Sequence, residues 1–184
     1  RLVASHASAD YLIVRELDLI HGGLDTVAQA PCRPNAPAVG ATRSDLTDAA
    51  MQDLLIWCRE SAAAVGPVPG DPILGMISPA DFRGDCVAAP LNAEEGPLGV
   101  VILVSRRSPF KPADQELLTH LCEPIGVALA NTARVRELKR LRESLENQRA
   151  IAESAGQADV KARLDLALET LEEAHVNTIH GFCA

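Results

Sequence analysis

Aromatic residues are scarce in this sequence of 184 residues, so the core must be built mainly from Ala, Val, Leu and Ile. No run reaches the roughly 18 apolar residues that a bilayer-spanning helix needs, and no signal-peptide pattern opens the chain. We therefore expect a cytoplasmic globular protein. Because the sequence begins at Arg1 without Met, we expect an internal piece of a longer chain. The five aromatic residues are Tyr11, Trp57, Phe82, Phe110 and Phe182.

Cysteine pairs of the CxxC type are missing, which argues against a zinc knuckle or a disulfide framework. Buried thiols are the expectation, and a redox-sensing group of Cys32, Cys58 and Cys86 is the alternative. The histidines are scattered along the chain, so we expect no cofactor and no metal. The remaining cysteines are Cys122 and Cys183.

A surplus of positive charge is absent too, because the formal net charge is −8. Nucleic-acid affinity comes largely from clustered Lys and Arg, so direct nucleic-acid binding is not expected. The basic run 134–149 is interleaved with glutamates, which is typical of a coiled-coil flank. No GxxxxGK[ST] phosphate loop occurs, so the sequence predicts no ATPase and no enzyme.

The first half of the chain predicts two strands, at 10–19 and 24–30, joined by a glycine turn. A proline-containing loop follows, and then a helix that starts at Ser44 or Asp45 and ends near Glu60, with Ser44 as its N-cap. Four prolines and three glycines between Gly66 and Pro79 predict an irregular segment.

The second half gives the clearest strands, 86–91 and 98–105, joined by a turn. The nearly continuous apolar run 98–105 predicts a central strand covered on both faces, and Gly99 would let a neighbouring backbone approach. One long helix is expected from Pro112 to about Ile151, kinked at Pro124. Its core face would hold Leu117, Leu118, Leu121, Ile125 and Leu129, and a second helix would run from about Val160 to Ala174.

Beyond residue 130 the apolar stripe of the long helix narrows to single positions spaced three, three and four residues apart. This spacing predicts a coiled-coil seam and therefore a homodimer. We expect three segments: a sensory domain at 1–133, a coiled-coil signalling helix at 134–153 and a helical tail at 154–184. The seam residues are Val135, Leu138, Leu141 and Leu145.

The segment 86–138 resembles a GAF domain. In that family a strand ending in Pro-Leu is followed by a Leu-Gly-Val strand, an aromatic, an acidic helix start with paired leucines, and an Ala-Leu-Ala-Asn exit. The resemblance implies an α+β fold with a central antiparallel sheet flanked by helices, and a sensory rather than catalytic role. The matching residues are Pro90-Leu91, Leu98-Gly99-Val100, Phe110, Asp114 with Leu117-Leu118, and 128–131.

GAF relatives imply a ligand pocket between the sheet and the segment 76–85. Trp57, Phe82, Arg83 and Asp85 are the candidates, since an aromatic wall with a few charged groups suits a small polar ligand. In the alternative, Trp57 and Phe82 are core residues and Arg83 is solvated.

Two further resemblances bear on the output. The segment 121–148 is similar to the linker between GAF domain and ATPase in enhancer-dependent bacterial transcription activators, although a sensor histidine kinase or a cyclase could carry a similar linker. Thr178 to Cys183, TIHGFC, resembles a nucleic-acid-contacting segment of superfamily-one nuclease-helicases, but the phosphate loop is absent. We therefore expect a sensory module whose output domain lies outside this sequence. A ligand-free dimerisation domain is the alternative, and a helicase fragment comes third.

Overall fold

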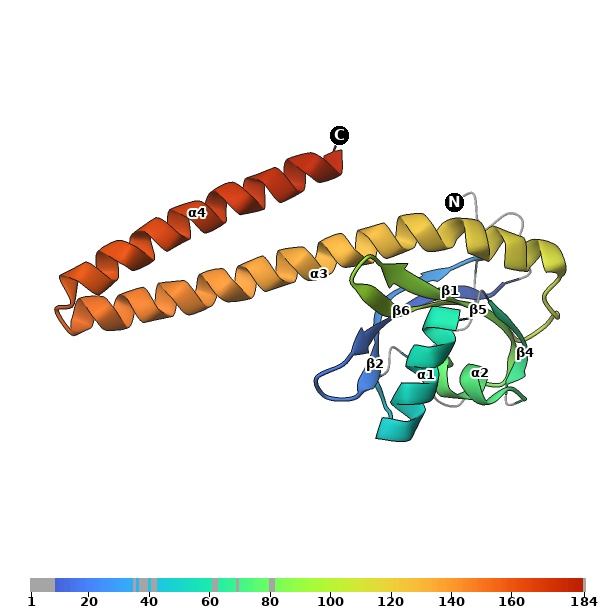
Figure 1. The fold of residues 1–184 in the computed structure, drawn as a ribbon. Coiled ribbons are helices and arrows are strands. Elements are labelled where there is room, and N and C mark those ends of the chain that lie inside the picture. Colours follow the sequence, from blue (N-terminus) through green and yellow to red (C-terminus); the bar gives the residue numbers. More distant parts are fainter. Residues whose placement is uncertain are drawn as a thin grey trace. The chain divides into compact units, whose positions relative to one another are not determined.

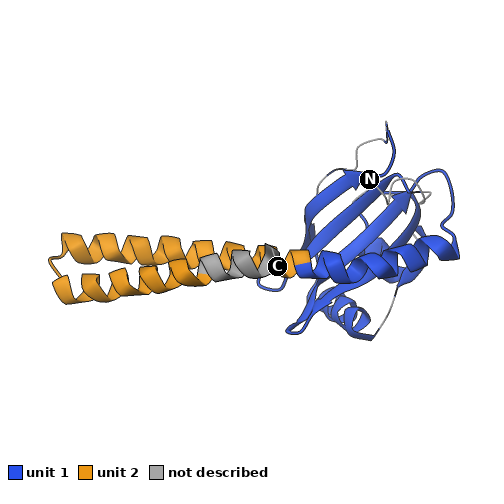
Figure 2. Cartoon of the chain, turned by 90° about the horizontal axis from the view of Figure 1, so that it is seen from above, with its two compact units in different colours: residues 1–127 blue, residues 128–184 orange. Residues whose placement is uncertain are grey.

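The computed structural model describes residues 9–34, 36, 40, 43–60, 63–68, 70–79 and 82–183, with side chains in the last helix described as far as Ala174. The chain divides into two compact units, residues 1–127 and 128–184, coloured separately in Figure 2. Part of the first loop and the segment 80–81 lie outside the described residues.

The described part of the first unit is built on one antiparallel sheet of six strands in the order β3-β2-β1-β6-β5-β4 (Figure 1). The four strands that the sequence predicts are all present. β6 pairs with β1 on one side and β5 on the other, which confirms it as a central strand. The strands are β1 (Tyr11–Asp18), β2 (Gly23–Pro31), β3 (Arg43–Asp45), β4 (Ala64–Val68), β5 (Gly84–Ala93) and β6 (Gly96–Ser105).

Gly99 has the role expected of it. A Cβ atom at this position would overlap the carbonyl oxygen of Arg15 on the neighbouring strand β1. Because glycine has no side chain, β1 and β6 come close enough there to pair from Tyr11↔Val104 to Glu16↔Gly99.

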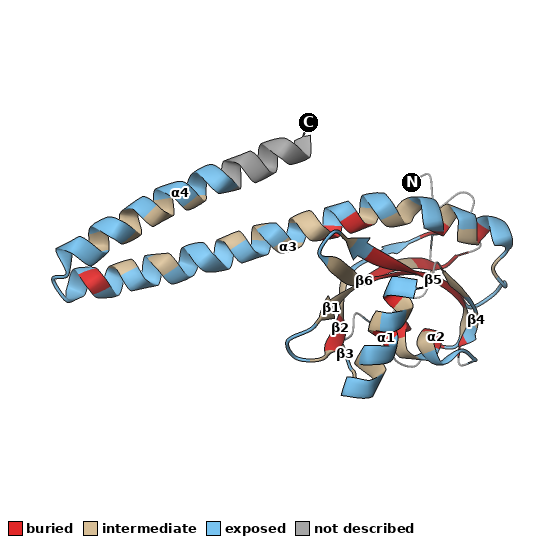
Figure 3. Ribbon diagram, in the orientation of Figure 1, coloured by how far each residue is buried: buried red, intermediate tan, exposed pale blue. Residues whose placement is uncertain are grey.

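Helices α1 (Asp48–Glu60) and α2 (Pro72–Ile77) pack on one face of the sheet. The core on this face is apolar and largely inaccessible to solvent, as the buried positions in Figure 3 show. Its large side chains come from strands and helices alike, and Trp57 packs against it partly buried. They include Ile13, Leu24, Leu54, Leu74, Ile77, Phe82, Val100 and Ile102.

The expected N-cap of α1 is wrong. The helix begins at Asp48, and the hydroxyl of Thr47 accepts a hydrogen bond from the backbone N–H of Ala50 at 3.3 Å. Ser44 lies instead in β3, where its backbone pairs with Leu24 and its hydroxyl is used by Arg15. Threonine and serine cap helices by the same bond, so residue type alone did not separate the two positions.

The expectation of an irregular segment at 66–79 is also wrong, because it contains most of β4 and all of α2. Pro67 is tolerated because β4 is an edge strand, where one missing N–H need not break the ladder. Asp71 caps α2: its Oδ1 accepts from the N–H groups of Ile73 at 2.7 Å and Leu74 at 3.0 Å. Pro72 occupies the first helical position, where it needs no donor.

Helix α3 (Pro112–Ser154) provides the second layer, since its first part runs over the opposite face of the sheet (Figure 1). Val87, Ala89, Val101 and Leu103 are buried on that face. Of the expected core-facing positions in α3, Leu118 and Leu129 are buried, and Leu117, Leu121 and Ile125 are partly buried. The helix continues without interruption through Pro124.

The second unit is a helical hairpin within one chain. The remainder of α3 is followed by a turn with Gly156 at φ 67°, and then by α4 (Ala158–Cys183). Among the side chains that are described, the ion pairs between the two helices include Arg142–Glu172 at 3.2 Å, Arg149–Asp165 at 2.6 Å and Lys161–Glu153 at 2.7 Å. Their order shows that α4 runs antiparallel to α3. In the described parts of the chain, neither of these long helices nor any other is apolar over enough of its length to cross a bilayer.

Candidate ligand site

The four residues that the sequence nominates for a ligand site do not converge. Phe82 is buried in the core and Trp57 packs against the same core from α1. Arg83 is exposed, and its Nη1 donates to the carbonyl oxygen of Phe82 at 2.9 Å. Asp85 lies on the opposite face of β5 from the buried Cys86, because side chains alternate along a strand.

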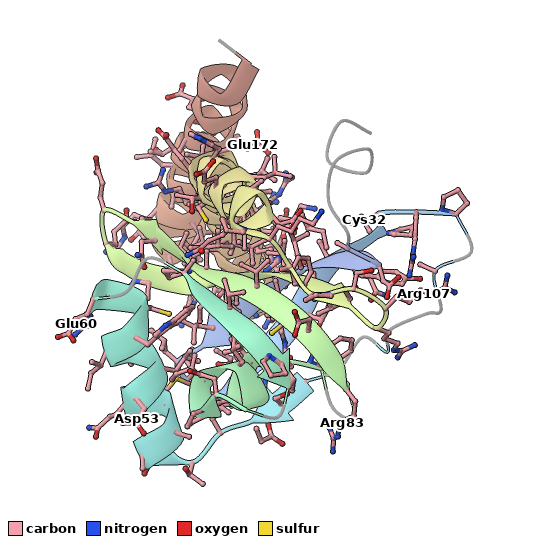
Figure 4. The ribbon with its side chains drawn as sticks, turned by 90° about the vertical axis from the view of Figure 1, so that its right-hand side faces the viewer. Cys32, Asp53, Glu60, Arg83, Arg107 and Glu172 are labelled. Atoms are coloured by element: carbon pink, nitrogen blue, oxygen red, sulfur yellow. The ribbon has the colours of Figure 1, made fainter. Side chains whose placement is uncertain are left out.

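An open depression lies beside Asp85, at the end of the sheet where β5 begins and β6 ends, with a cavity volume of about 290 Å³. Arg83 and Arg107, both exposed, lie at the same side of the view in Figure 4. We call this depression the rim pocket. Of its lining residues, the sequence nominated only Asp85. The lining residues are Pro67, Val68, Gly84, Asp85, Ser105, Arg106, Arg107, Ser108 and Pro109.

Buried or partly buried side chains hold the segment that closes the rim pocket. Asp10 Oδ2 accepts from the backbone N–H of Arg106 at 2.8 Å, and Asp85 Oδ2 accepts from that of Phe110 at 3.0 Å. The hydroxyl of Ser105, which is buried, accepts from the N–H groups of Arg107 and Ser108. The connection between β6 and α3 is therefore fixed by hydrogen bonds almost residue by residue.

The same pattern reaches the start of α3. Asp114 is 4 % exposed, and its Oδ2 accepts from the backbone N–H of Lys111 at 2.8 Å. This carboxylate lies in the first turn of α3, two residues after Pro112. The rim pocket is thus built on the residues that lead straight into the long helix.

A second unusual group is Arg15, which is fully buried on the face covered by α1 and α2. Its Nη1 donates to the carbonyl oxygen of Ile77 at 2.7 Å, and its Nη2 donates to that of Leu24 at 2.9 Å and to Ser44 Oγ at 2.8 Å. Burial lowers the pKa of Arg15 to about 10, against a smaller opposing effect of Asp25, so the guanidinium stays charged at neutral pH. One side chain therefore ties β1 to β2, β3 and the end of α2.

Three of the four cysteines whose side chains are described match the buried-thiol expectation. Cys32, Cys58 and Cys86 are free and buried, and Cys122 is partly buried. Burial raises the pKa of Cys58 and of Cys86 to about 11 in each case, so these thiols are protonated at neutral pH. Reactive cysteines have depressed pKa values, which is the opposite of what is found here.

The predicted seam residues lie in the hairpin. Val135, Leu138 and Leu145 are partly buried, whereas Leu141 is 45 % exposed. In α4, Leu164, Leu168 and Leu171 are partly buried at matching three- and four-residue spacing. Part of the apolar stripe that predicts a dimer is therefore packed against α4 of the same chain. The side chains of the TIHGFC segment lie outside the described residues, although its backbone through Cys183 belongs to α4.

One family model matches part of this chain. The model of the GAF domain matches residues 59–129, which run from the end of α1 through β6 into α3. No curated protein matches.

Among solved structures, the blue-light-absorbing form of the Thermosynechococcus elongatus PixJ GAF domain has a TM-score of 0.49 and 14% identity, covering 76% of this chain and 83% of that one. The red-light-absorbing state of NpR6012g4, a red/green cyanobacteriochrome, has a TM-score of 0.49 and 15% identity, covering 68% and 85%. At this identity and TM-score, the similarity gives no information about a ligand of this chain. Residues 59–129, by the family match, are similar to the GAF domain, as the sequence resemblance implied.

Proposed function

We propose that this chain is a regulatory sensory module that binds a small ligand at the rim pocket and passes its state to α3. The observation that carries the proposal is the position of the pocket, because four of its lining residues, 106–109, belong to the connection between β6 and that helix. The match to the GAF domain over 59–129 supports a sensory module. Binding sites on loops held by a rigid scaffold are common, and this connection is held by a sheet.

The physical route is short. A ligand that contacts residues 106–109 changes the hydrogen bonds that fix this connection, including the bond from Phe110 N–H to Asp85 Oδ2. Two residues later α3 begins at Pro112. A shift in the first turn of a continuous helix is transmitted along its axis, because the helix is a rigid element.

The proposal includes a homodimer that forms through α3. Leu141 supports this, since α4 leaves it the most exposed of the four seam residues. Dimerisation would add a second hairpin to the one that each chain already forms, giving a bundle in place of a two-stranded coiled coil.

For the output, we propose an ATPase of the enhancer-dependent transcription activators, encoded beyond this sequence. A histidine-kinase core is the competing output. The chain itself is proposed to have no catalytic activity and no direct contact with nucleic acid. An ATPase assay that detects turnover by the purified chain would contradict this part of the proposal.

The test of ligand binding is a titration of the ¹⁵N-labelled chain with cyclic nucleotides, 2-oxo acids and small aromatic compounds. We expect at least one class to give saturable shifts of the amides in 105–111 together with amides in α3. Trp57 fluorescence would report on the core instead, because Trp57 packs there. Saturable shifts on another surface would move the site, and a chain that responds to no class would favour a ligand-free dimerisation domain.

A further inference from the structure

Positive charge is unevenly placed in the first unit. In residues 1–127, acidic side chains outnumber basic ones by sixteen to nine. Among the described residues, Arg33 pairs with Asp10, Arg43 pairs with three aspartates, and Arg15 is buried. Four cations nevertheless line the rim pocket or lie within two residues of its lining along the chain: Arg83, Arg106, Arg107 and Lys111.

The sheet register explains why these cations come together. Asp85 pairs with Ser105, so the start of β5 and the end of β6 lie side by side. Arg83 precedes β5 by one residue, and Arg106 and Arg107 directly follow β6. Among the described residues, neither Arg106 nor Arg107 forms an ion pair with a carboxylate.

In each of three described carboxylates near this rim, one oxygen accepts from a backbone N–H group. Asp85 Oδ2 accepts from Phe110 N–H, Asp10 Oδ2 from Arg106 N–H and Asp114 Oδ2 from Lys111 N–H. These bonds hold the connection between β6 and α3 in place. The guanidinium groups of Arg106 and Arg107 can then contact a ligand in the pocket.

Arg106 is also oriented. Its guanidinium carbon lies 5.9 Å from the centre of the Phe82 ring, within the range of a cation–π contact, and Phe82 is buried. With its backbone N–H bound to Asp10, the residue is fixed at both ends. A guanidinium presents two parallel N–H donors, a geometry that matches phosphate and carboxylate oxygens.

We propose that the rim pocket recognises a small oxyanion, a phosphate or carboxylate group, through Arg106 and Arg107. This rests on the proposed function, because it assigns the ligand class of the same site. The volume of about 290 Å³ limits the ligand to a small molecule. Asp85 lines the same pocket as a hydrogen-bond acceptor, so the part of the ligand facing it carries a hydroxyl or amino donor and not a second anion.

The experiment is a ¹⁵N chemical-shift titration of the full chain at pH 7 and constant ionic strength. Inorganic pyrophosphate and malonate are the two probes, and sodium chloride is the reference. We expect saturable shifts at residues 84–85 and 105–111 with at least one probe. The probe that binds with the lower Kd shows whether the pocket prefers a phosphate or a carboxylate group.

Arg106→Gln and Arg107→Gln should each weaken binding about tenfold, which corresponds to losing roughly one charged hydrogen bond. The double variant should abolish it. Arg59→Gln, on the exposed side of α1, is the matched control and should bind as the wild type does. Circular dichroism of each variant checks that the sheet is intact, and the single Arg107→Gln exchange decides the matter if Arg106→Gln unfolds.

Non-saturable shifts, or shifts that persist in the double variant, would overturn the oxyanion proposal. Its failure is distinguishable from failure of the sensory function. If a neutral compound gives saturable shifts at 105–111 and in α3 while both anions fail, the sensory pocket stands and only the ligand class is wrong.

Discussion

At the scale of single residues, Arg15 is the clearest departure from an ordinary apolar core. Its donors reach the carbonyl oxygens of Ile77 and Leu24 and the hydroxyl of Ser44, which belong to three different elements. Buried charges persist in proteins when they are fully hydrogen-bonded. The residue therefore fixes how α2 and the edge of the sheet sit on β1.

Arg15→Met should lower the free energy of unfolding by about 2–4 kcal/mol. The shorter apolar side chain of methionine fills only part of the space and leaves several buried acceptors without a donor, at about 1–3 kcal/mol each before relaxation. Arg15→Lys should recover only part of the loss, because a single ammonium group cannot reach every acceptor at once. Urea denaturation measures both. Arg59→Met, on an exposed site, should change stability by less than about 0.5 kcal/mol, and equal effects at the two sites would contradict the role of Arg15.

Asp18 predicts a pH dependence. Its pKa is held well below the usual range, chiefly by the backbone N–H of His21 and further by the side chains of Arg43 and His21. The native state therefore holds the carboxylate ionised more strongly than the unfolded chain does. The contribution of Asp18 to stability is fully present above the pKa of the unfolded chain, about 4, and is lost as the pH falls below that value. Between pH 7 and pH 3, the urea midpoint should fall less in Asp18→Asn than in the wild type. An equal fall in both would refute the contribution of Asp18.

At the scale of elements, the pairing of β1 with β6 depends on Gly99, where a Cβ would overlap the Arg15 carbonyl. Gly99→Ala should therefore lower stability by roughly 1–3 kcal/mol, since the strands must separate. Gly75→Ala is the matched control: nothing lies within 4 Å of the added carbon, and alanine favours the helix. Thermal unfolding followed by circular dichroism compares them. A loss at Gly75 as large as that at Gly99 would show that crowding at β1 is not the cause.

Strong periodic signals made most elements predictable. The runs 10–19 and 98–105 predicted β1 and β6 because buried strands are rich in branched apolar residues. The edge elements were missed for a physical reason. Pro67 and Gly66 argue against a strand, yet pairing with β5 overrides this at a sheet edge. For α2, the cap Asp71 followed by Pro72 was an available signal that the surrounding prolines obscured.

The candidate site was predictable only in part. Asp85 was identified from its place in the 76–85 segment, but Arg106 and Arg107 have no motif and become notable only through the register of β5 and β6. Arg15 was missed although alternation places it on the same face as Tyr11 and Ile13. A charged residue on the inward side of an otherwise apolar strand was the signal that could have identified it.

At the scale of the whole molecule, the stripe on α3 has two uses, one within the hairpin and one proposed between chains. Leu141→Asp separates them, because Leu141 is exposed in the single chain. We expect the wild type to be a dimer by light scattering at tens of micromolar. The variant should become a monomer of unchanged helix content. Leu166→Asp, on an exposed position of α4, should remain dimeric. A monomeric wild type would mean that the apolar stripe of α3 is buried sufficiently by α4 within one chain.

Amide hydrogen exchange of Asp85→Ala measures whether the rim pocket is coupled to α3, and it requires no ligand. The variant removes the acceptor of the Phe110 N–H, whereas Ser108→Ala changes the pocket lining and serves as the control. We expect faster exchange at 110–111 and onward through α3 past residue 128 in Asp85→Ala alone, with the exchange of β1 and β6 unchanged. Exchange that quickens only at 106–111, and leaves α3 as in the wild type, would contradict transmission.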